Sequence, residues 1–345
     1  MSEAMQQRKR GRRPRAALAV AALGATASWG APAVPAAAAP PDTGAYLGVW
    51  NYDQPDRRTM RNIAEISCLP AEPDCDSFIP GVPAGEPVQI PQIGRVVFRK
   101  GAGPGEVVGR TDRGCTWSFE VRGRALELAP PGQRCTNKVI DSDYTLLSWS
   151  VRVSGRHERE TIKGISHHEE DYAFTLANGS RTRDGAEPWP RAARRFGGRW
   201  TYDPADPSRM INMVVHRGPD GPRRSERRGQ VDMVVLPDRT IAARTSDGCR
   251  WTLAASGNTA ELAPPGQTCT RAGESVTLDF WQVASDGRRQ ASIMKGSVRR
   301  DGRTSAFLLN VGALTRPAAR SRAGADPDGE NVPAETGHKE GLRRR

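Results

Sequence analysis

Two copies of an acidic motif contain the residues of this chain that could do chemistry. Each copy reads Tyr-Asp-x-x-Asp and is followed by an asparagine. Carboxylate and amide oxygens in such a group could bind a hard cation such as Ca²⁺ or a carbohydrate, and paired carboxylates could serve a hydrolase. The same residue types form Asx turns that end a strand, which is the interpretation we favour. The residues are Asp53, Asp56 and Asn62 in the first copy, and Asp203, Asp206 and Asn212 in the second.

Other signatures of catalysis are missing from the sequence. It contains no G-x-S-x-G nucleophile elbow, no H-E-x-x-H zinc motif and no phosphate-binding loop. A structural zinc site would need four ligands together, which the two cysteines of the second half cannot supply. We therefore expect no catalytic residue, no metal ion and no cofactor.

Tryptophans are the second set of candidates, because six of the eight recur at matching places in the two halves of the chain. Large aromatic side chains usually pack a core. The functional alternative is an aromatic-lined cavity or a platform for a saccharide. The pairs are Trp50 with Trp200, Trp117 with Trp251, and Trp149 with Trp281.

These recurrences belong to a tandem duplication. Four blocks of sequence occur twice in the same order, and the most similar pair reads GCTWSFEVRGRALELAPPGQRCT and GCRWTLAASGNTAELAPPGQTCT. The repeated units span residues 44–185 and 196–317 and are joined by a linker, residues 186–195. We expect two homologous domains, because a chain of 345 residues is long enough for both.

The two ends of the chain are set apart by composition. Residues 1–39 combine a basic segment, a short apolar stretch and A-x-A sites, which predicts a secretory signal peptide. Residues 318–345 are polar and rich in proline and glycine, which predicts a disordered tail. No apolar run long enough for a transmembrane helix follows the signal. We therefore expect a secreted protein that is extracellular or associated with the cell wall.

An exported protein with an even number of cysteines is expected to form disulfides. The second unit can pair its two cysteines only with each other, and the repeat transfers that pairing to the first unit. The two remaining cysteines then close a proline-rich excursion. The expected bridges are Cys249–Cys269, Cys115–Cys135 and Cys68–Cys75.

Strict alternation of apolar and polar residues predicts strands rather than helices. Residues 115–122 alternate in this way, and Gly123–Arg124 is the expected hairpin turn, which sets Phe119 opposite Leu128. Similar short strands are expected at 46–52, 59–66, 95–100, 106–112, 144–153, 159–165 and 172–179. The pattern predicts an all-β chain with about eight antiparallel strands per unit, as a closed barrel or a sandwich.

Two resemblances bear on the fold. A unit that opens with Gly-x-Trp and ends with an arginine near its last strand resembles the calycin superfamily, the lipocalins and avidins. That resemblance implies two β-barrels in which the tryptophan closes one end and the arginine packs over it. The block GC.W…AELAPPGQ.C is similar to a family of uncharacterised secreted bacterial β-domains, which implies no activity. The matching calycin positions are Gly48, Trp50 and Arg183, then Gly198, Trp200 and Arg316.

A barrel would turn a defined set of side chains inward, and these are the expected ligand-binding residues. The second unit has smaller residues on one hairpin face, with Leu253 and Ala260 in place of Phe119 and Leu126. Because lost volume leaves space unless it is compensated, we expect the larger cavity in the second barrel. The inward set is Trp50, Tyr52, Trp117, Phe119, Trp200, Tyr202, Trp251 and Leu253.

Together these observations predict a secreted, non-enzymatic protein that binds an extracellular ligand or surface. The formal net charge is +12, of which +5 lies in residues 1–16, and the remainder suits a small apolar molecule or an anionic wall polymer or glycan as partner. Basic and aromatic residues do not cluster, so no specific nucleic-acid binding is expected. Two alternatives stay open: a hydrolase using Asp53/Asp56 and Asp203/Asp206, and a protease-inhibitor-like protein using the Cys68–Cys75 loop.

Overall fold

The computed structural model of the chain describes residues 42–71, 75, 86–167, 170–219, 221–271 and 273–317. The predicted signal peptide and the predicted tail lie outside the described residues. So do residues 72–74 of the loop that Cys68 and Cys75 close. The predicted linker contains a short helix, α1 (Trp189–Ala193).

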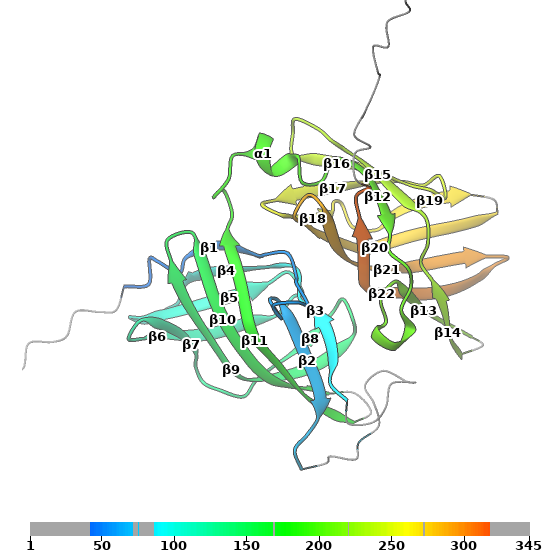
Figure 1. The fold of residues 1–345 in the computed structure, drawn as a ribbon. Helices are drawn as coiled ribbons and strands as arrows, with labels where there is room; N and C mark the ends of the chain where they lie inside the picture. The colour runs from blue at the N-terminus through cyan, green and yellow to red at the C-terminus, as the bar shows by residue number, and fades with distance from the viewer. Residues whose placement is uncertain are drawn as a thin grey trace, which may run out of the picture. The chain divides into compact units, whose positions relative to one another are not determined.

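The first repeated unit is a closed antiparallel β-barrel (Figure 1). Eight strands follow one another around it, and the last pairs back with the first through Trp50 and Arg183. Closure confirms the all-β prediction and decides between the barrel and the sandwich. In barrel order the strands are β1 (Gly48–Tyr52), β4 (Arg95–Lys100), β5 (Glu106–Thr111), β6 (Thr116–Arg122), β7 (Ala125–Leu128), β9 (Ser142–Ser154), β10 (His157–His167) and β11 (Asp171–Arg183).

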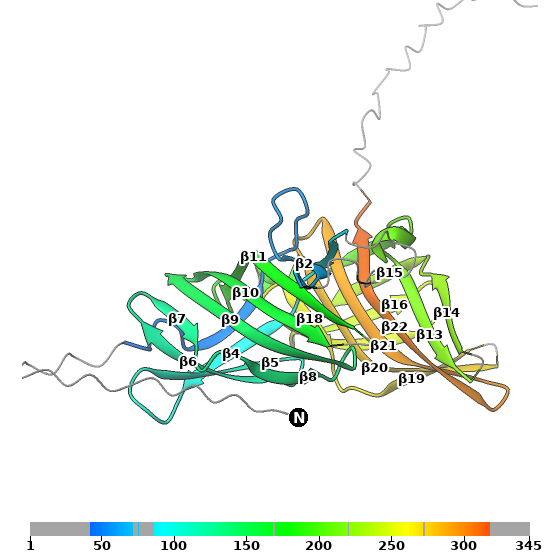
Figure 2. The same cartoon turned by 90° about the horizontal axis from the view of Figure 1, so that it is seen from below.

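The second unit repeats this barrel strand for strand. Its closing pair joins Tyr202 to Leu314, and its three longest strands run side by side in the same order as β9, β10 and β11 (Figure 2). In barrel order the strands are β12 (Gly198–Tyr202), β15 (Gln230–Val235), β16 (Thr240–Thr245), β17 (Arg250–Ser256), β18 (Thr259–Leu262), β20 (Glu274–Ser285), β21 (Arg289–Arg300) and β22 (Arg303–Thr315).

Each barrel carries three further strands. A hairpin of β2 (Ile63–Cys68) and β3 (Val88–Pro91) is added to β11, and its counterpart of β13 (Met213–Gly218) and β14 (Gly221–Glu226) is added to β22. β1 pairs with residues 181–183 of β11, whereas β2 pairs with residues 172–175 of the same strand. The hairpin therefore continues the barrel wall beyond the end of β1.

The third added strand carries the cysteine of the repeated block. β8 (Gln133–Asn137) and β19 (Gln267–Arg271) pair with β9 and β20, so Cys135 lies opposite Tyr144. Before each of them the chain bends at a cis peptide bond, Ala129–Pro130 or Ala263–Pro264. The hairpin itself has the predicted register, with Phe119 opposite Leu128 and Leu253 opposite Leu262.

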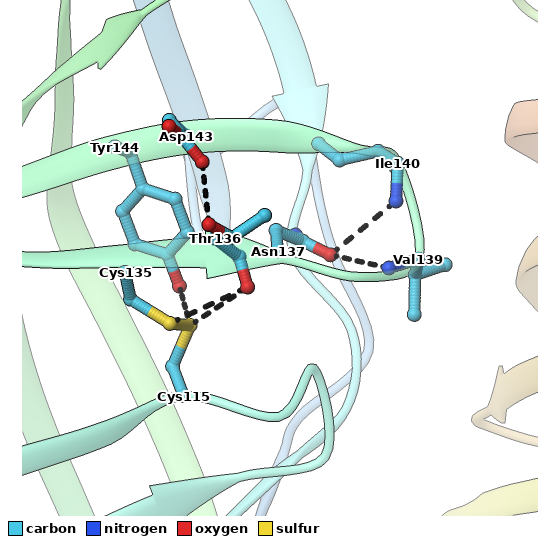
Figure 3. The surroundings of a disulfide bond; sticks show 8 residues. All are labelled: Cys115, Cys135, Thr136, Asn137, Val139, Ile140, Asp143 and Tyr144. Atoms are coloured by element: carbon cyan, nitrogen blue, oxygen red, sulfur yellow. Dashed lines mark hydrogen bonds between the residues drawn. A yellow bond between two sulfur atoms is a disulfide. The ribbon is translucent and has the colours of Figure 1, made fainter.

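All three predicted disulfides are present. Cys115–Cys135 joins the start of β6 to β8, with Cα atoms 5.8 Å apart. Cys249–Cys269 joins the start of β17 to β19, with Cα atoms 5.7 Å apart. Cys68–Cys75 closes the loop that follows β2. Figure 3 shows the Cys115–Cys135 bridge, where the Tyr144 hydroxyl donates to Cys115 Sγ at 3.2 Å. The bridge thus fastens β8 to the barrel beside the interior.

Candidate functional site

One end of each barrel is closed by a tryptophan under an arginine. The Arg183 guanidinium lies 4.6 Å from the ring centre of Trp50, and Arg316 lies at the same distance from Trp200. The Trp50 indole donates to the Tyr46 carbonyl, and Arg183 donates to the Ala45 carbonyl. This geometry agrees with what the calycin resemblance implies for Gly48, Trp50 and Arg183 and for their counterparts.

The acidic motif of the first unit is engaged in internal hydrogen bonds. Asp53 accepts from the hydroxyls of Ser180 and Thr182 at 2.8 and 2.7 Å. Asn62 has a left-handed backbone (φ 54°), and its side chain donates to the Asp53 and Ser180 carbonyls and accepts from the Ser180 amide. Asp56 accepts from the Arg58 amide. These contacts fasten the turn after β1 to the end of β11, as an Asx-type turn would.

The second unit repeats the same arrangement. Asn212 donates to the carbonyls of Asp203 and Ala313 and accepts from the Ala313 amide. Asp206 accepts from the backbone and the hydroxyl of Ser208 at the start of a 3₁₀ turn, Pro207–Arg209. Asn62 and Asn212 are both fully buried. A ligand role at this rim stays a prediction, while the structural role is visible in every one of these bonds.

A cavity of about 180 Å³ is lined almost entirely by residues of the first barrel and its added hairpin, and Ile293 and Asn310 of the second unit complete the lining. Aromatic side chains of the barrel strands form much of its wall, among them Trp117, Tyr144 and Trp149. Ile66 of β2 and Ile90 of β3 also line it. The added hairpin is therefore part of the wall and not only an appendage of the sheet.

Arg181 of β11 brings a guanidinium to this cavity, and its side chain is only 2% exposed. The group lies 3.6 Å from the ring centre of Tyr52. Its Nε and Nη2 donate to one oxygen of Glu160 at 3.2 and 3.1 Å, and the Trp149 indole donates to the other at 2.8 Å. A buried ion pair with this many hydrogen bonds holds the guanidinium in one orientation.

Gly179 makes room for this cluster. Gly179 lies opposite Glu160 on the neighbouring strand, and a Cβ at this position would collide with the Glu160 side chain. The equivalent Gly312 faces Ser292 in the same way. The glycine of the repeated block therefore allows a close approach between β10 and β11 in the first barrel and between β21 and β22 in the second.

Glu158 completes the cluster on β10. Its Oε1 lies 3.2 Å from Arg181 Nε, and the residue is 1% exposed. Burial raises the pKa of Glu158 well above its usual value. The nearby Arg181 lowers this pKa and the nearby Glu160 raises it, but burial is the largest effect. Burial therefore favours the neutral form of this carboxyl.

Three buried polar atoms on cavity-lining residues have no hydrogen-bond partner among the described residues. They are Nη1 of Arg181, the indole nitrogen of Trp117 and the hydroxyl oxygen of Thr111. Leaving a buried donor without an acceptor costs about 1–3 kcal/mol, and more for a charged group. An acceptor on a molecule in the cavity would offset this cost.

The second barrel lacks the charged cluster. The two barrels share one strand register, which identifies the equivalent positions. Leu314 stands at the position of Arg181, Gln290 at that of Glu158, and Ser292 at that of Glu160. Trp281 still finds an acceptor, because its indole donates to Ser292 Oγ at 3.0 Å. The charged cluster is thus a private feature of the first barrel and is not needed to build the fold.

The described cavity is lined mainly by the first barrel, and the larger cavity expected in the second barrel stays a prediction. That prediction considered a single hairpin face. Elsewhere the second barrel gains volume, with Ile241 and Ala243 in place of Val107 and Gly109. A methionine also replaces Ile162 in the second core, at Met294. Interior volume is a sum over all inward positions, so one face does not determine it.

The predicted inward set is buried throughout, but only part of it reaches the cavity. Tyr52 and Trp117 line it, whereas Trp50 closes the barrel end and Phe119 packs against Phe98 and Trp149. The paired tryptophans are all core residues. Exposure does not exceed 7% for any of Trp50, Tyr52, Trp117, Phe119, Trp200, Tyr202, Trp251 and Leu253.

Sequence reasoning missed Arg181 and the two glutamates beside it. The sequence contained a signal for Arg181, because this residue occupies an inward-facing position of its strand at which the other repeat has a leucine. A charged residue at an apolar, inward-facing position in only one of two repeats indicates a role that the other repeat does not share.

Within the described residues, no group of histidine, cysteine, aspartate or glutamate is arranged to hold a metal ion. The helices of the described part are also too short or too polar to cross a membrane.

Comparison with known proteins gives weak likenesses of fold. No family model matches the chain, and no curated protein does. A protein of unknown function of the DUF3598 family from Nostoc punctiforme is 11% identical over 79% of this chain and 97% of its own, with a TM-score of 0.21. An outer membrane protein of unproven assignment from Bacteroides fragilis is 7% identical over 78% and 97%, with a TM-score of 0.24. A variant of the vaccine antigen transferrin binding protein B from Haemophilus parasuis is 7% identical over 78% and 76%, with a TM-score of 0.22. Likeness at this level assigns neither family nor function.

Proposed function

We propose that this is an exported, non-enzymatic binding protein whose first barrel holds a small, mainly apolar molecule. The observation that carries the proposal is the cavity of about 180 Å³, lined mainly by the first barrel, with aromatic side chains in its wall and buried donors that have no partner among the described residues. Pockets of this kind, apolar with a few placed polar groups, are typical of small-molecule sites. The predicted signal peptide and the three disulfides support binding outside the cell.

The size of the cavity limits the ligand. Drug-sized ligands occupy pockets of about 300–1,000 Å³, whereas a cavity of about 150 Å³ accepts a molecule the size of benzene. The first barrel therefore suits a single substituted ring or a short branched chain. Long-chain lipids and large cofactors are too big for the space as it stands.

Binding of cumene (isopropylbenzene) to the full-length protein tests the proposal. We expect saturable binding with one site per chain by titration calorimetry. Ala64→Leu should abolish it, because Ala64 lines the cavity and a larger side chain takes up its volume. The matched control is Val214→Leu at the equivalent position of the second barrel, which should leave binding unchanged. Absence of saturable binding, or loss of binding in the control alone, would contradict the proposal.

The other interpretations remain weaker. The hydrolase alternative uses Asp53/Asp56 and Asp203/Asp206. The side chains of Asp56 and Asp206 accept hydrogen bonds within their own turns, and that of Asp53 accepts from two hydroxyls of β11. The inhibitor-like alternative uses a loop of which residues 72–74 lie outside the described part of the chain. Binding of an anionic wall polymer or glycan stays a prediction from charge alone.

A further inference from the structure

We propose that the ligand of the first barrel carries a neutral carbonyl oxygen, which accepts a hydrogen bond from Arg181. This inference rests on the proposed function and adds the chemical class of the ligand: a small aromatic or branched-aliphatic ketone, aldehyde or amide. It starts from the position of Arg181, whose side chain is almost fully buried, lines the cavity and has no partner for Nη1 among the described residues.

The ligand must supply an acceptor rather than a donor. A guanidinium can only donate, and so can the indole nitrogen of Trp117, whereas the unpartnered hydroxyl of Thr111 can donate or accept. A hydrocarbon in the cavity would leave both donors unsatisfied. An oxygen with lone pairs would satisfy at least one, and hydrogen bonds to charged groups are among the stronger ones in proteins.

The ligand is expected to be neutral because the charge of Arg181 is already balanced. Glu160 holds the guanidinium through two donors and is itself held by Trp149. Glu158, on the other side, does not line the cavity. The other charged residues of the cavity lining are Arg95, Asp112 and Arg113. At Arg181 Nη1, a ligand carboxylate would lie next to two buried carboxyl groups, which is unfavourable in a medium of low dielectric constant. A carbonyl gains the hydrogen bond without that penalty.

The position of the oxygen is also fixed by the packing around Arg181. Tyr52 lies against one face of the guanidinium at 3.6 Å, and Glu160 takes Nε and Nη2. Nη1 is then the corner of the guanidinium that stays open. The apolar part of the ligand would lie among the aromatic side chains that form the rest of the wall.

Three isosteric probes test the inference on the full-length protein: acetophenone, cumene and benzoate. They have the same shape, and they differ in offering a neutral oxygen, a methyl group or a charged carboxylate. We expect acetophenone to bind roughly ten-fold or more tightly than cumene, from the gain of one hydrogen bond to a charged donor. Benzoate should bind more weakly than acetophenone. Equal binding of acetophenone and cumene, or tighter binding of benzoate, would overturn the inference.

The second barrel supplies the variant that removes the cluster as a unit. Glu158→Gln, Glu160→Ser and Arg181→Leu together install the residues found at the equivalent positions, Gln290, Ser292 and Leu314. This avoids leaving one partner of a buried ion pair alone, which destabilises strongly, whereas replacing the whole set is often tolerated. The triple variant should lose the preference for acetophenone while it still binds cumene. A preference that survives in the folded variant would overturn the inference.

A crystal structure of the unmodified protein with acetophenone provides a test that needs no variant. The ketone oxygen should lie within hydrogen-bond distance of Arg181 Nη1, and an oxygen that points elsewhere in the cavity contradicts the inference. The two proposals fail separately. If none of the three probes binds, the proposed function fails, whereas if cumene binds as well as acetophenone, only the carbonyl assignment fails.

Discussion

At the scale of single residues, the two barrels differ most in what faces inward near the ends of β10 and β11. The first has an arginine and two glutamates there, and the second has a leucine, a glutamine and a serine at the same positions. Burying charges is expensive unless they are paired, and even paired sets rarely stabilise a fold more than apolar residues of the same volume. The second barrel shows that the fold does without them. The charged set is therefore better explained by binding than by stability.

The titration of Glu158 gives a prediction at this scale. Its pKa is raised by burial in the folded protein, while in the unfolded chain it titrates near 4.3. Below that pH both states are protonated. Above it only the unfolded state releases the proton, so stability falls by up to ~1.4 kcal/mol per pH unit until the folded carboxyl also ionises. Glu158→Gln does not titrate, so its stability relative to the unmodified protein should rise with pH.

Urea denaturation of both proteins between pH 4 and pH 8 checks this. All other titrating groups are common to the pair and cancel in the difference. A difference in unfolding free energy that stays constant or shrinks over this range would mean that Glu158 is ionised in the fold. The substitution introduces the residue that the second barrel has at Gln290, so packing alone should not disturb the comparison.

At the scale of elements, the stapled hairpin shows how far the sequence could be interpreted. Alternation of apolar and polar residues determined the strands β6 and β7, and coincidence of their apolar faces determined the register, with Phe119 opposite Leu128. β8 escaped prediction because Gln133–Asn137 has no apolar alternation and is half-exposed. β3 escaped because it has only four residues and ends in a proline. Short polar strands that are added to an existing sheet are held by backbone pairing, which sequence patterns do not show.

The repeated disulfide gives a prediction for this element. Each bridge closes 20 residues of chain, and cross-linking a loop of this length restricts the unfolded state by roughly 3 kcal/mol in the entropy model. Replacing both cysteines by alanine in either barrel should lower the unfolding free energy of that barrel by about this amount. The two double variants should behave alike, because loop length and bridge position are the same. Denaturant unfolding followed separately for each barrel measures it, and a negligible loss in either variant would contradict the model.

At the scale of the whole molecule, duplication made the architecture predictable and left the site open. Four repeated blocks gave the two units, and the second unit decided the cysteine pairing of the first. The choice between barrel and sandwich could not be made from the sequence, because both are built from the same short alternating strands. One hairpin face also could not decide which barrel has the larger cavity, since the space depends on every inward side chain, including Ile241 and Ala243, which are larger than Val107 and Gly109 at the equivalent positions.

The division into two domains is itself a prediction. Each barrel closes on its own strands, through β1 with β11 and β12 with β22. A chain of residues 186–317 should therefore fold alone and unfold in a single cooperative transition. Thermal unfolding monitored by near-ultraviolet circular dichroism tests this. A product without fixed aromatic signals or without a cooperative transition would show that the second unit depends on the first.

The most direct test of the central claim, that the first barrel binds a small ligand inside, is an NMR titration of the tryptophan indoles with acetophenone. Trp117 and Trp149 line the cavity, and their second-barrel partners Trp251 and Trp281 provide an internal control within the same molecule. The account predicts that the indole N–H signals of Trp117 and Trp149 shift in a saturable manner while those of Trp251 and Trp281 stay in place. Saturable shifts confined to the second pair, or no saturable shift in either pair, would contradict it.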